Sequence, residues 1–263
     1  MTTASTPHAA LVRRIAADIV SAAPFDGYGD DVGSSFADGY AVQDALVAHL
    51  VAEGIRGRVA GYKVAANAPH LLEKLGLPEP LSARIFADQY LDSPADLSAK
   101  AFRQRAFEPE IAALIASDVP AGAHDRDSIL PHVARLVPAF EVLDMREVQM
   151  SPAAMPWAVA QNISNEGVVI GGPGLPPGEV DPASLRACVT FAGSELADVT
   201  GKAPQHPLDV VAWIAGHLAR RGLGLTAGMV VMCGTHTPIL FPEGAGLLRL
   251  EMPGLGEAEV MLG

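Results

Sequence analysis

From Arg58 to the C-terminus, short apolar runs alternate with glycine and proline turns, and this pattern limits the fold more than any other feature of the sequence. Runs of this length between turn residues predict β-strands. One stretch differs, because its apolar residues recur at helical spacing between Pro207 and Gly222. We therefore expect a β-rich unit crossed by one long helix, with strands at Val59–Val64, Glu110–Ala116, Ala139–Leu143, Val168–Ile170, Val230–Cys233 and Leu247–Glu251.

The segment before Arg58 has a helical pattern instead. Apolar residues recur at helical spacing from Pro7 to Ala23, and Ser35 precedes a second such stretch that ends at Gly54. A shorter helix is expected over Pro69–Leu75. The chain is therefore predicted to have an α+β fold, with an N-terminal helical cap (residues 1–57) and a β-rich domain (residues 58–263).

The charge balance narrows the classes of partner. The chain carries 30 Asp and Glu against 18 Lys and Arg, a formal net charge of −12. Nucleic-acid binding is not expected, because phosphate contacts need clustered cations. The negative net charge does not exclude a small anionic substrate, since a local cation or metal ion can make the electrostatic potential at a binding site positive. No apolar run is long enough for a membrane helix and Arg13, Arg14 and Asp18 break up the first apolar stretch, so we expect no membrane span or signal peptide and a cytoplasmic protein.

Glu108 and Glu110 form the sharpest local motif, in Phe107-Glu108-Pro109-Glu110-Ile111. In a strand, residues two apart project from the same face, so the two carboxylates would lie side by side and repel each other. The apolar run that follows argues against a solvated face. A hard divalent cation would resolve the repulsion, because all-oxygen sites suit Mg²⁺, Mn²⁺ or Ca²⁺. A solvated strand edge is the alternative for this pair taken alone.

Two more charged residues stand inside apolar runs. Glu141 lies in Ala139-Phe140-Glu141-Val142-Leu143, where burial is costly unless the carboxylate is paired or bound to metal. Lys63 lies in Gly61-Tyr62-Lys63-Val64, where a buried ammonium needs an anionic partner. The alternative for Lys63 is a side chain that reaches out to solvent from a strand end.

Taken in order, these segments resemble the 2-keto-4-pentenoate hydratase / 2-oxohepta-4-ene-1,7-dioate hydratase / 4-oxalocrotonate decarboxylase family of the fumarylacetoacetate hydrolase superfamily. The resemblance extends over nearly the whole chain, and the order of the motifs makes it specific. The matching stretches are Gly39–Gln43, Gly61–Val64, Glu108–Ala112, Pro138–Arg146, Asn162–Ser164, Val211–Ile214, Ala227–Val231 and Gly234-Thr235.

The resemblance implies a mixed β-sandwich or β-roll catalytic core with N-terminal helices. It also implies a metal site made of Glu108, Glu110 and Glu141, holding Mg²⁺ or Mn²⁺. A small 2-oxo acid substrate would bind through the metal, with Lys63 beside it. The catalytic residues implied or suggested are Lys63, Glu141 and His236, and the substrate-binding residues are Lys63, Asn162, Ser164 and Thr235.

Several positions depart from the hydratase pattern. Leu81 and Gln161 stand where the family has aspartates, and the stretch that ends in "TGSLT" in the family reads Cys233-Gly234-Thr235-His236-Thr237. The metal site is thus retained, whereas the proton-handling groups differ. His236 and Glu166 are the suggested replacements, and the general acid and base stay unassigned.

The leading hypothesis is a metal-dependent lyase that adds water to a 2-hydroxy-2,4-dienoate, as in the breakdown of aromatic compounds. The alternatives are decarboxylation of an oxalocrotonate-like acid, C–C hydrolysis of an acylpyruvate, and a non-catalytic subunit that associates with a related family member. A homo-oligomer is expected by resemblance. A dicarboxylate substrate would need a second cationic site, for which the candidates are Arg84, Arg103 and Arg105.

Overall fold

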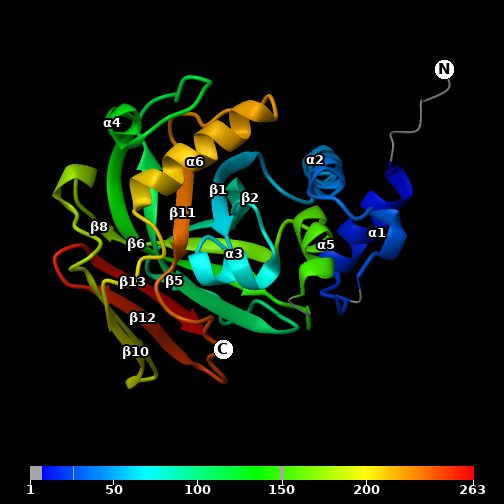
Figure 1. Ribbon diagram of the computed structural model, residues 1–263. Helices are drawn as coiled ribbons and strands as arrows, with labels where there is room; N and C mark the ends of the chain where they lie inside the picture. Colours follow the sequence, from blue (N-terminus) through cyan, green and yellow to red (C-terminus); the bar gives the residue numbers. More distant parts are fainter. Residues whose placement is uncertain (1–7, 26, 149–150) are drawn as a thin grey trace.

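The computed structural model describes residues 8–25, 27–148 and 151–263 and has the predicted α+β architecture. Two β-sheets pack against each other, with α6 on one side of them and the N-terminal helices α1 and α2 at one end (Figure 1). The helices are α1 (Ala9–Val20), α2 (Phe36–Ala52), α3 (Pro69–Leu75), α4 (Arg126–Ile129), α5 (Met155–Ala160) and α6 (Pro207–Arg220). None of the helices in these ranges is long and apolar enough to cross a membrane.

The larger sheet, sheet A, has the strand order β2-β1-β11-β5-β6-β7-β3 and mixes parallel with antiparallel pairs. It curls, so that β2 and β7 come into contact although other strands separate them in the sheet. Ile85 of β2 therefore packs beside Val168 and Ile170 of β7 within one buried cluster. We call the face that carries this cluster the inner face. The strands are β1 (Val59–Ala65), β2 (Leu81–Phe86), β3 (Tyr90–Asp92), β5 (Arg105–Ile115), β6 (Val133–Asp144), β7 (Asn165–Ile170) and β11 (Val230–Thr235).

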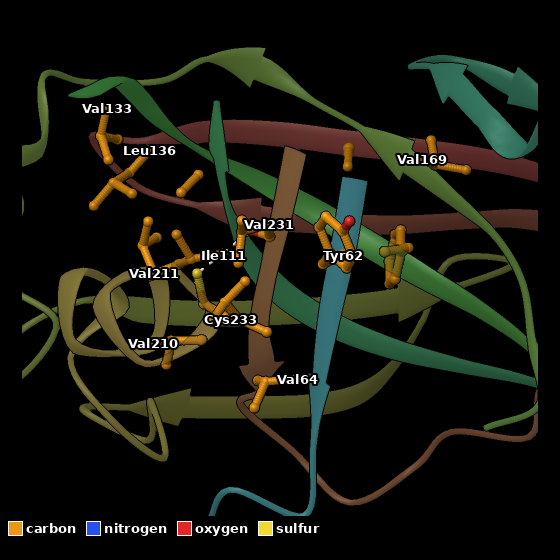
Figure 2. Close-up of a cluster of buried hydrophobic side chains, with 14 of the residues drawn as sticks. Tyr62, Val64, Ile111, Val133, Leu136, Val169, Val210, Val211, Val231 and Cys233 are labelled. Carbon is orange, nitrogen blue, oxygen red and sulfur yellow. Dashed lines mark hydrogen bonds between the residues drawn. The ribbon is translucent and has the colours of Figure 1, made fainter. Parts of the chain in front are cut away.

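The smaller sheet, sheet B, covers part of the outer face of sheet A together with α6. Its strands follow the order β10-β9-β12-β13-β4, and β8 pairs with β13. Figure 2 shows the shared core, in which Val210 and Val211 of α6 lie against Val231 and Cys233 of β11. The strands are β4 (Ala95–Asp96), β8 (Gly172–Pro173), β9 (Arg186–Phe191), β10 (Ser194–Thr200), β12 (Gly246–Met252) and β13 (Gly256–Leu262).

The N-terminal helices lie beside α5, away from sheet B (Figure 1). Ser35 caps α2 as predicted, because its hydroxyl accepts the Asp38 N–H at 3.1 Å and Asp38 reaches back to the cap. The α1–α2 pair has a buried cluster of its own, and this cluster also includes Phe86 of β2 and Ala160 of α5. The helices thus pack directly on the β-rich part, and their standing as a separate domain stays a prediction.

Each strand predicted from the sequence coincides with an observed strand, but most of the observed strands are longer than predicted. β5 starts at Arg105, five residues before the predicted start at Glu110, and β6 starts at Val133. Glu108, Pro109 and Glu110 interrupt the apolar pattern of β5, so the local sequence does not predict a strand there. The strand forms nevertheless, because this part of β5 pairs with β6. Seven strands of the described residues were missed: β2, β3, β4, β8, β9, β10 and β13. In β9, β10 and β13 most outward residues are polar, and in β2 Ser82 and Arg84 interrupt the apolar run.

Candidate metal centre

Three glutamates meet on neighbouring strands at the inner face of sheet A. Phe107 and Ile111 of β5 pack into the outer-face core, so Glu108 and Glu110, one residue out of step, project to the inner face. On β6, Glu141 lies directly opposite Glu108. One carboxylate oxygen from each glutamate lies within 4.8 Å of the other two. The predicted set Glu108, Glu110 and Glu141 is thus brought together by the sheet register.

The two fully buried glutamates each have one oxygen engaged and one free. Glu141 Oε1 accepts from Lys63 Nζ at 2.8 Å and from Asn165 Nδ2 at 2.9 Å. Glu110 Oε2 accepts from the backbone N–H of Gly234 at 2.7 Å. Glu110 Oε1 and Glu141 Oε2 are buried and have no hydrogen-bond partner among the described residues. The protein therefore fixes one oxygen of each carboxylate and leaves the other available to a ligand.

Burial makes the ionised forms of Glu108 and Glu110 unfavourable. Burial and the neighbouring Glu141 raise the pKa of Glu108 to about 8. Burial and the other two glutamates raise the pKa of Glu110 well above its usual range. Burial alone would lower the pKa of Lys63, but Glu141, Glu108 and Glu110 outweigh it, so the pKa is raised and the ammonium persists. Without a further cation, Glu108 and Glu110 therefore tend to keep their protons at pH 7, and a divalent cation bound here would favour their ionised forms.

The donor set fits a hard divalent metal ion. It consists of carboxylate oxygens, which Mg²⁺, Mn²⁺ and Ca²⁺ prefer over nitrogen or sulfur ligands. Two of these oxygens are buried and unpartnered, a state that costs free energy unless a cation binds there. Glu108, Glu110 and Glu141 are therefore the residues that would hold such an ion.

The end of β11 and the residue after it run alongside the part of β5 that carries the two glutamates. The backbone N–H of His236 donates to the carbonyl of Pro109 at 2.9 Å. The half-buried Thr235 is the register partner of Glu110, and its hydroxyl donates to the carbonyl of Thr237 at 2.9 Å. The His236 side chain is buried, which lowers its pKa to about 4, so the imidazole is neutral at pH 7. Thr235 is thus opposite Glu110 in the sheet and the His236 backbone is bonded to Pro109, whereas the catalytic and substrate-binding roles of the two side chains stay predictions.

Asn162, Ile163 and Ser164 form a tight turn between α5 and β7, each with positive φ. The Asn162 amide makes two 2.8 Å hydrogen bonds to the backbone N–H and carbonyl of Arg84, so the predicted substrate contact of Asn162 would compete with them. The Ser164 hydroxyl accepts from Gln161 Nε2 at 3.3 Å. The turn therefore fixes the start of β7 against β2.

The suggested replacement Glu166 is engaged elsewhere. Its carboxylate pairs with Arg56 at 3.1 Å and with Lys100 at 3.2 Å, outside the glutamate cluster. Leu81, where the family has an aspartate, is buried in an apolar cluster with Leu75 and Val159. Of the two replacements suggested from the sequence, His236 is the one whose backbone is bonded to β5, at Pro109.

The three arginines considered for a second substrate carboxylate all have other partners. Arg84 and Arg105 belong to the outer face, since along their strands they are out of step with Ile85 and Glu108, which lie on the inner one. Arg84 pairs with Asp44, Arg103 bonds Glu147 at 3.0 Å, and Arg105 donates to backbone carbonyls that include Gly244 at 2.9 Å.

Two residues of the site were missed by sequence reasoning. Asn165 lies just beyond the Asn162–Ser164 motif, and nothing local distinguishes its amide from a surface asparagine. Gly234 was noted only as part of a family stretch, yet its N–H is the donor to Glu110. Its φ is 102°, and a Cβ added to it would lie 2.6 Å from Asn67 Oδ1, so a side chain does not fit. A glycine directly after a buried strand, opposite a glutamate, was the signal that could have found it.

Comparison with known proteins agrees with this geometry. A family model described as "Fumarylacetoacetate (FAA) hydrolase C-terminal" matches residues 74–262. A 2-keto-4-pentenoate hydratase of Burkholderia vietnamiensis (strain G4 / LMG 22486) is 28% identical over 200 residues, 76% of either chain. 2-Keto-4-pentenoate hydratase 1 of Dechloromonas aromatica (strain RCB) is 26% identical over 258 residues, 96% of this chain and 95% of that protein.

Solved structures show the same fold. The 4-oxalocrotonate decarboxylase from Pseudomonas putida G7, complexed with magnesium and adipate, superposes with a TM-score of 0.87. The two chains are 22% identical, and the match covers 97% of this chain and 96% of that one. A second structure of that decarboxylase is complexed with calcium and acetate. The predicted mixed-sheet core with N-terminal helices is therefore confirmed as a fold.

Proposed function

The chain belongs to the fumarylacetoacetate hydrolase family, and from this premise we propose that it is a divalent-metal-dependent lyase that adds water to a small 2-hydroxy-2,4-dienoate. The observation that carries the proposal is the cluster of Glu108, Glu110 and Glu141 with Lys63 at its edge. Relatives named as hydratases of 2-keto-4-pentenoate and of 2-hydroxyhexa-2,4-dienoate support the reaction class.

Glu108, Glu110 and Glu141 would hold a divalent ion, which would supply Lewis-acid stabilisation of negative charge at the 2-oxo oxygen of the substrate. We propose Mg²⁺, because the site is all-oxygen and the solved relatives hold magnesium or calcium, with Mn²⁺ as the other candidate. Lys63 keeps Glu141 oriented through the 2.8 Å contact and adds positive charge for an anionic substrate. Its raised pKa keeps it protonated, so it does not serve as the base.

His236 is the residue we propose for proton transfer to or from the substrate. Its imidazole is neutral at pH 7 and therefore able to accept a proton, and its Nδ1 has no hydrogen-bond partner among the residues described. Thr235 and Ser164 would contribute hydroxyl groups, and Asn162 an amide, to substrate binding. Each of these side chains belongs to a segment adjacent to the carboxylates or to the turn before β7.

We further propose that the substrate carries one carboxylate. Arg84, Arg103 and Arg105, the candidates for binding a second carboxylate, are engaged by Asp44, Glu147 and backbone carbonyls. A substrate with an uncharged tail needs no further cation. Homo-oligomerisation, association with a related subunit, a cytoplasmic location and a role in the breakdown of aromatic compounds remain proposals that rest on the family alone.

The test combines three variants with two readouts. Purified protein with Mg²⁺ and 2-hydroxypenta-2,4-dienoate should remove the diene absorbance, and Glu108→Ala should abolish this turnover. Glu251→Gln, which alters an exposed carboxylate of β12, should behave as wild type. His236→Gln should lower kcat and keep Mg²⁺ binding. Full activity of Glu108→Ala would refute the proposal.

The same assay separates the alternatives. Release of CO₂ from an oxalocrotonate-like acid, without hydration of the dienoate, would identify a decarboxylase. Cleavage of an acylpyruvate would identify a C–C hydrolase. Calorimetric binding of Mg²⁺ and oxalate without turnover of any of these compounds would identify a non-catalytic subunit. A kcat/KM at least tenfold lower for a dienoate with a second carboxylate would support the monocarboxylate substrate.

A further inference from the structure

Asn165 is the first residue of β7 and is buried with a relative exposure of 6%. Its Nδ2 donates to Glu141 Oε1 at 2.9 Å, the same oxygen that Lys63 contacts at 2.8 Å. The two donors come from different sides, because β7 is the strand next to β6 whereas β1 lies three strands away from β6 in sheet A. Together they hold one oxygen of Glu141 and leave Oε2 free of hydrogen bonds to the described residues.

The orientation of the Asn165 amide is fixed by what lies on either side of it. Turning the amide over would place Oδ1 against Glu141 Oε1, so two acceptors would repel each other. Asn165 lines a small cavity together with Gln161 and Ser164. Asn165 Oδ1 and Gln161 Oε1 are both buried acceptors without a hydrogen-bond partner among the described residues. A volume of about 10 Å³ is roughly the space that one water molecule needs to donate to both.

The two buried glutamates are oriented by different kinds of hydrogen-bond donor. Glu110 is oriented by the backbone N–H of Gly234, which its place in β11 fixes. Glu141 takes its hydrogen bonds within the described residues from two side chains, and one of them, Lys63, is long and has many rotamers. A short, rigid amide on the neighbouring strand provides the directional contact that the lysine lacks.

We infer that Asn165 is a positioning residue for the metal centre: it holds Glu141 Oε1 so that Oε2 points towards the bound ion. The inference rests on the proposed function, since it requires that the glutamates hold a divalent ion. Asn165 would touch neither the ion nor the substrate and would act through Glu141 alone. Partners of this kind typically contribute about 10–100-fold to metal affinity.

Calorimetric titration with MgCl₂ tests the inference directly. Asn165→Leu, which keeps the size of the side chain and removes the donor, should bind Mg²⁺ about 10–100-fold more weakly than wild type. Gln89→Leu is the matched control, because Gln89 lines the same cavity, is equally buried, and bonds only to the backbone of Phe86 and Asn165. It should keep the wild-type affinity even if it loses stability. Should Asn165→Leu not fold, Asn165→Ala removes the donor without adding a branched side chain.

Kinetics provide the readout that general loss of structure would not reproduce. In Asn165→Leu, the Mg²⁺ concentration for half-maximal activity should rise by the same factor, and saturating Mg²⁺ should restore kcat with little change in the KM for substrate. Wild-type Mg²⁺ affinity in Asn165→Leu would overturn the positioning role and leave the proposed function standing. No Mg²⁺ binding by the wild-type protein would overturn both.

Discussion

Glu108→Gln should make the metal-free protein more stable, although it removes a residue of the candidate site. In the folded chain, burial and Glu141 raise the pKa of Glu108 from 4.5 to about 8. A carboxyl group whose pKa is raised on folding destabilises the folded state increasingly as the pH rises from the unfolded value to the folded one. At pH 7 the difference of about 2.5 pH units from the unfolded pKa corresponds to about 3 kcal/mol.

The neutral amide of Glu108→Gln does not carry this penalty. In EDTA at pH 7, we expect its free energy of unfolding to exceed that of wild type by about 3 kcal/mol, or roughly 6 to 12 °C in Tm. At pH 5 the same arithmetic predicts less than about 1 kcal/mol, because this pH lies only about 0.5 unit above the unfolded pKa of 4.5. Urea or thermal unfolding at the two pH values measures both differences.

Mg²⁺ should cancel most of this difference in stability. At a concentration 100 times its Kd, Mg²⁺ stabilises wild type by about 2.7 kcal/mol, and Glu108→Gln should lose most of this gain. A Glu108→Gln protein that is no more stable than wild type in EDTA at pH 7 would refute the reasoning. The folded protein would then carry no free-energy cost from a raised pKa of Glu108. Equal Mg²⁺ stabilisation of both proteins would refute the assignment of Glu108 as a ligand.

Three other perturbations have distinct expected results. Gly234→Ala should displace the backbone N–H that donates to Glu110, because the added Cβ would meet Asn67 and Pro204 within 2.8 Å. The Mg²⁺ affinity measured by calorimetry should then fall at least about tenfold. An unchanged affinity would argue against the Gly234 contact. Ser35→Ala should remove the cap of α2, lowering stability by about 1 kcal/mol in urea unfolding without changing activity. Burial, and then Arg221, lower the pKa of His217 to about 4, so stability should fall as the pH drops from about 6.5 to about 4. His217→Phe should flatten this acid limb of the stability profile, and a profile identical to wild type would contradict it.

The sequence was most informative where a charged residue interrupts an apolar strand. Glu108, Glu110, Glu141 and Lys63 were each unusual in their own segments, and the sheet register brings all of them to one face. Burial makes such residues conspicuous, because an unpaired charge in an apolar run is costly. The candidate metal ligands could therefore be predicted from the amino-acid sequence alone.

The supporting residues could not be predicted in this way. Asn165 and Gly234 are ordinary in their local sequence and gain a role only because β7 lies beside β6 and the end of β11 beside β5. The ends of β5 and β6 were also missed, since strand pairing over long sequence distances extends them beyond the apolar pattern. The engagement of Arg84 by Asp44 likewise depends on the contact between α2 and β2, which no local pattern encodes.

The strand order of sheet A has a consequence for synthesis of the chain. β11 lies between β1 and β5, yet it begins at Val230, which is 230 − 115 = 115 residues after β5 ends at Ile115. At about 5–20 residues per second, a ribosome needs roughly 6 to 23 s to bridge that gap. During this interval, the nascent β1 and β5 both present unpaired backbone edges, which are prone to pair with other chains. The glutamates of β5 lie along one of these edges, and charged side chains on an exposed strand oppose pairing with other chains until β11 arrives.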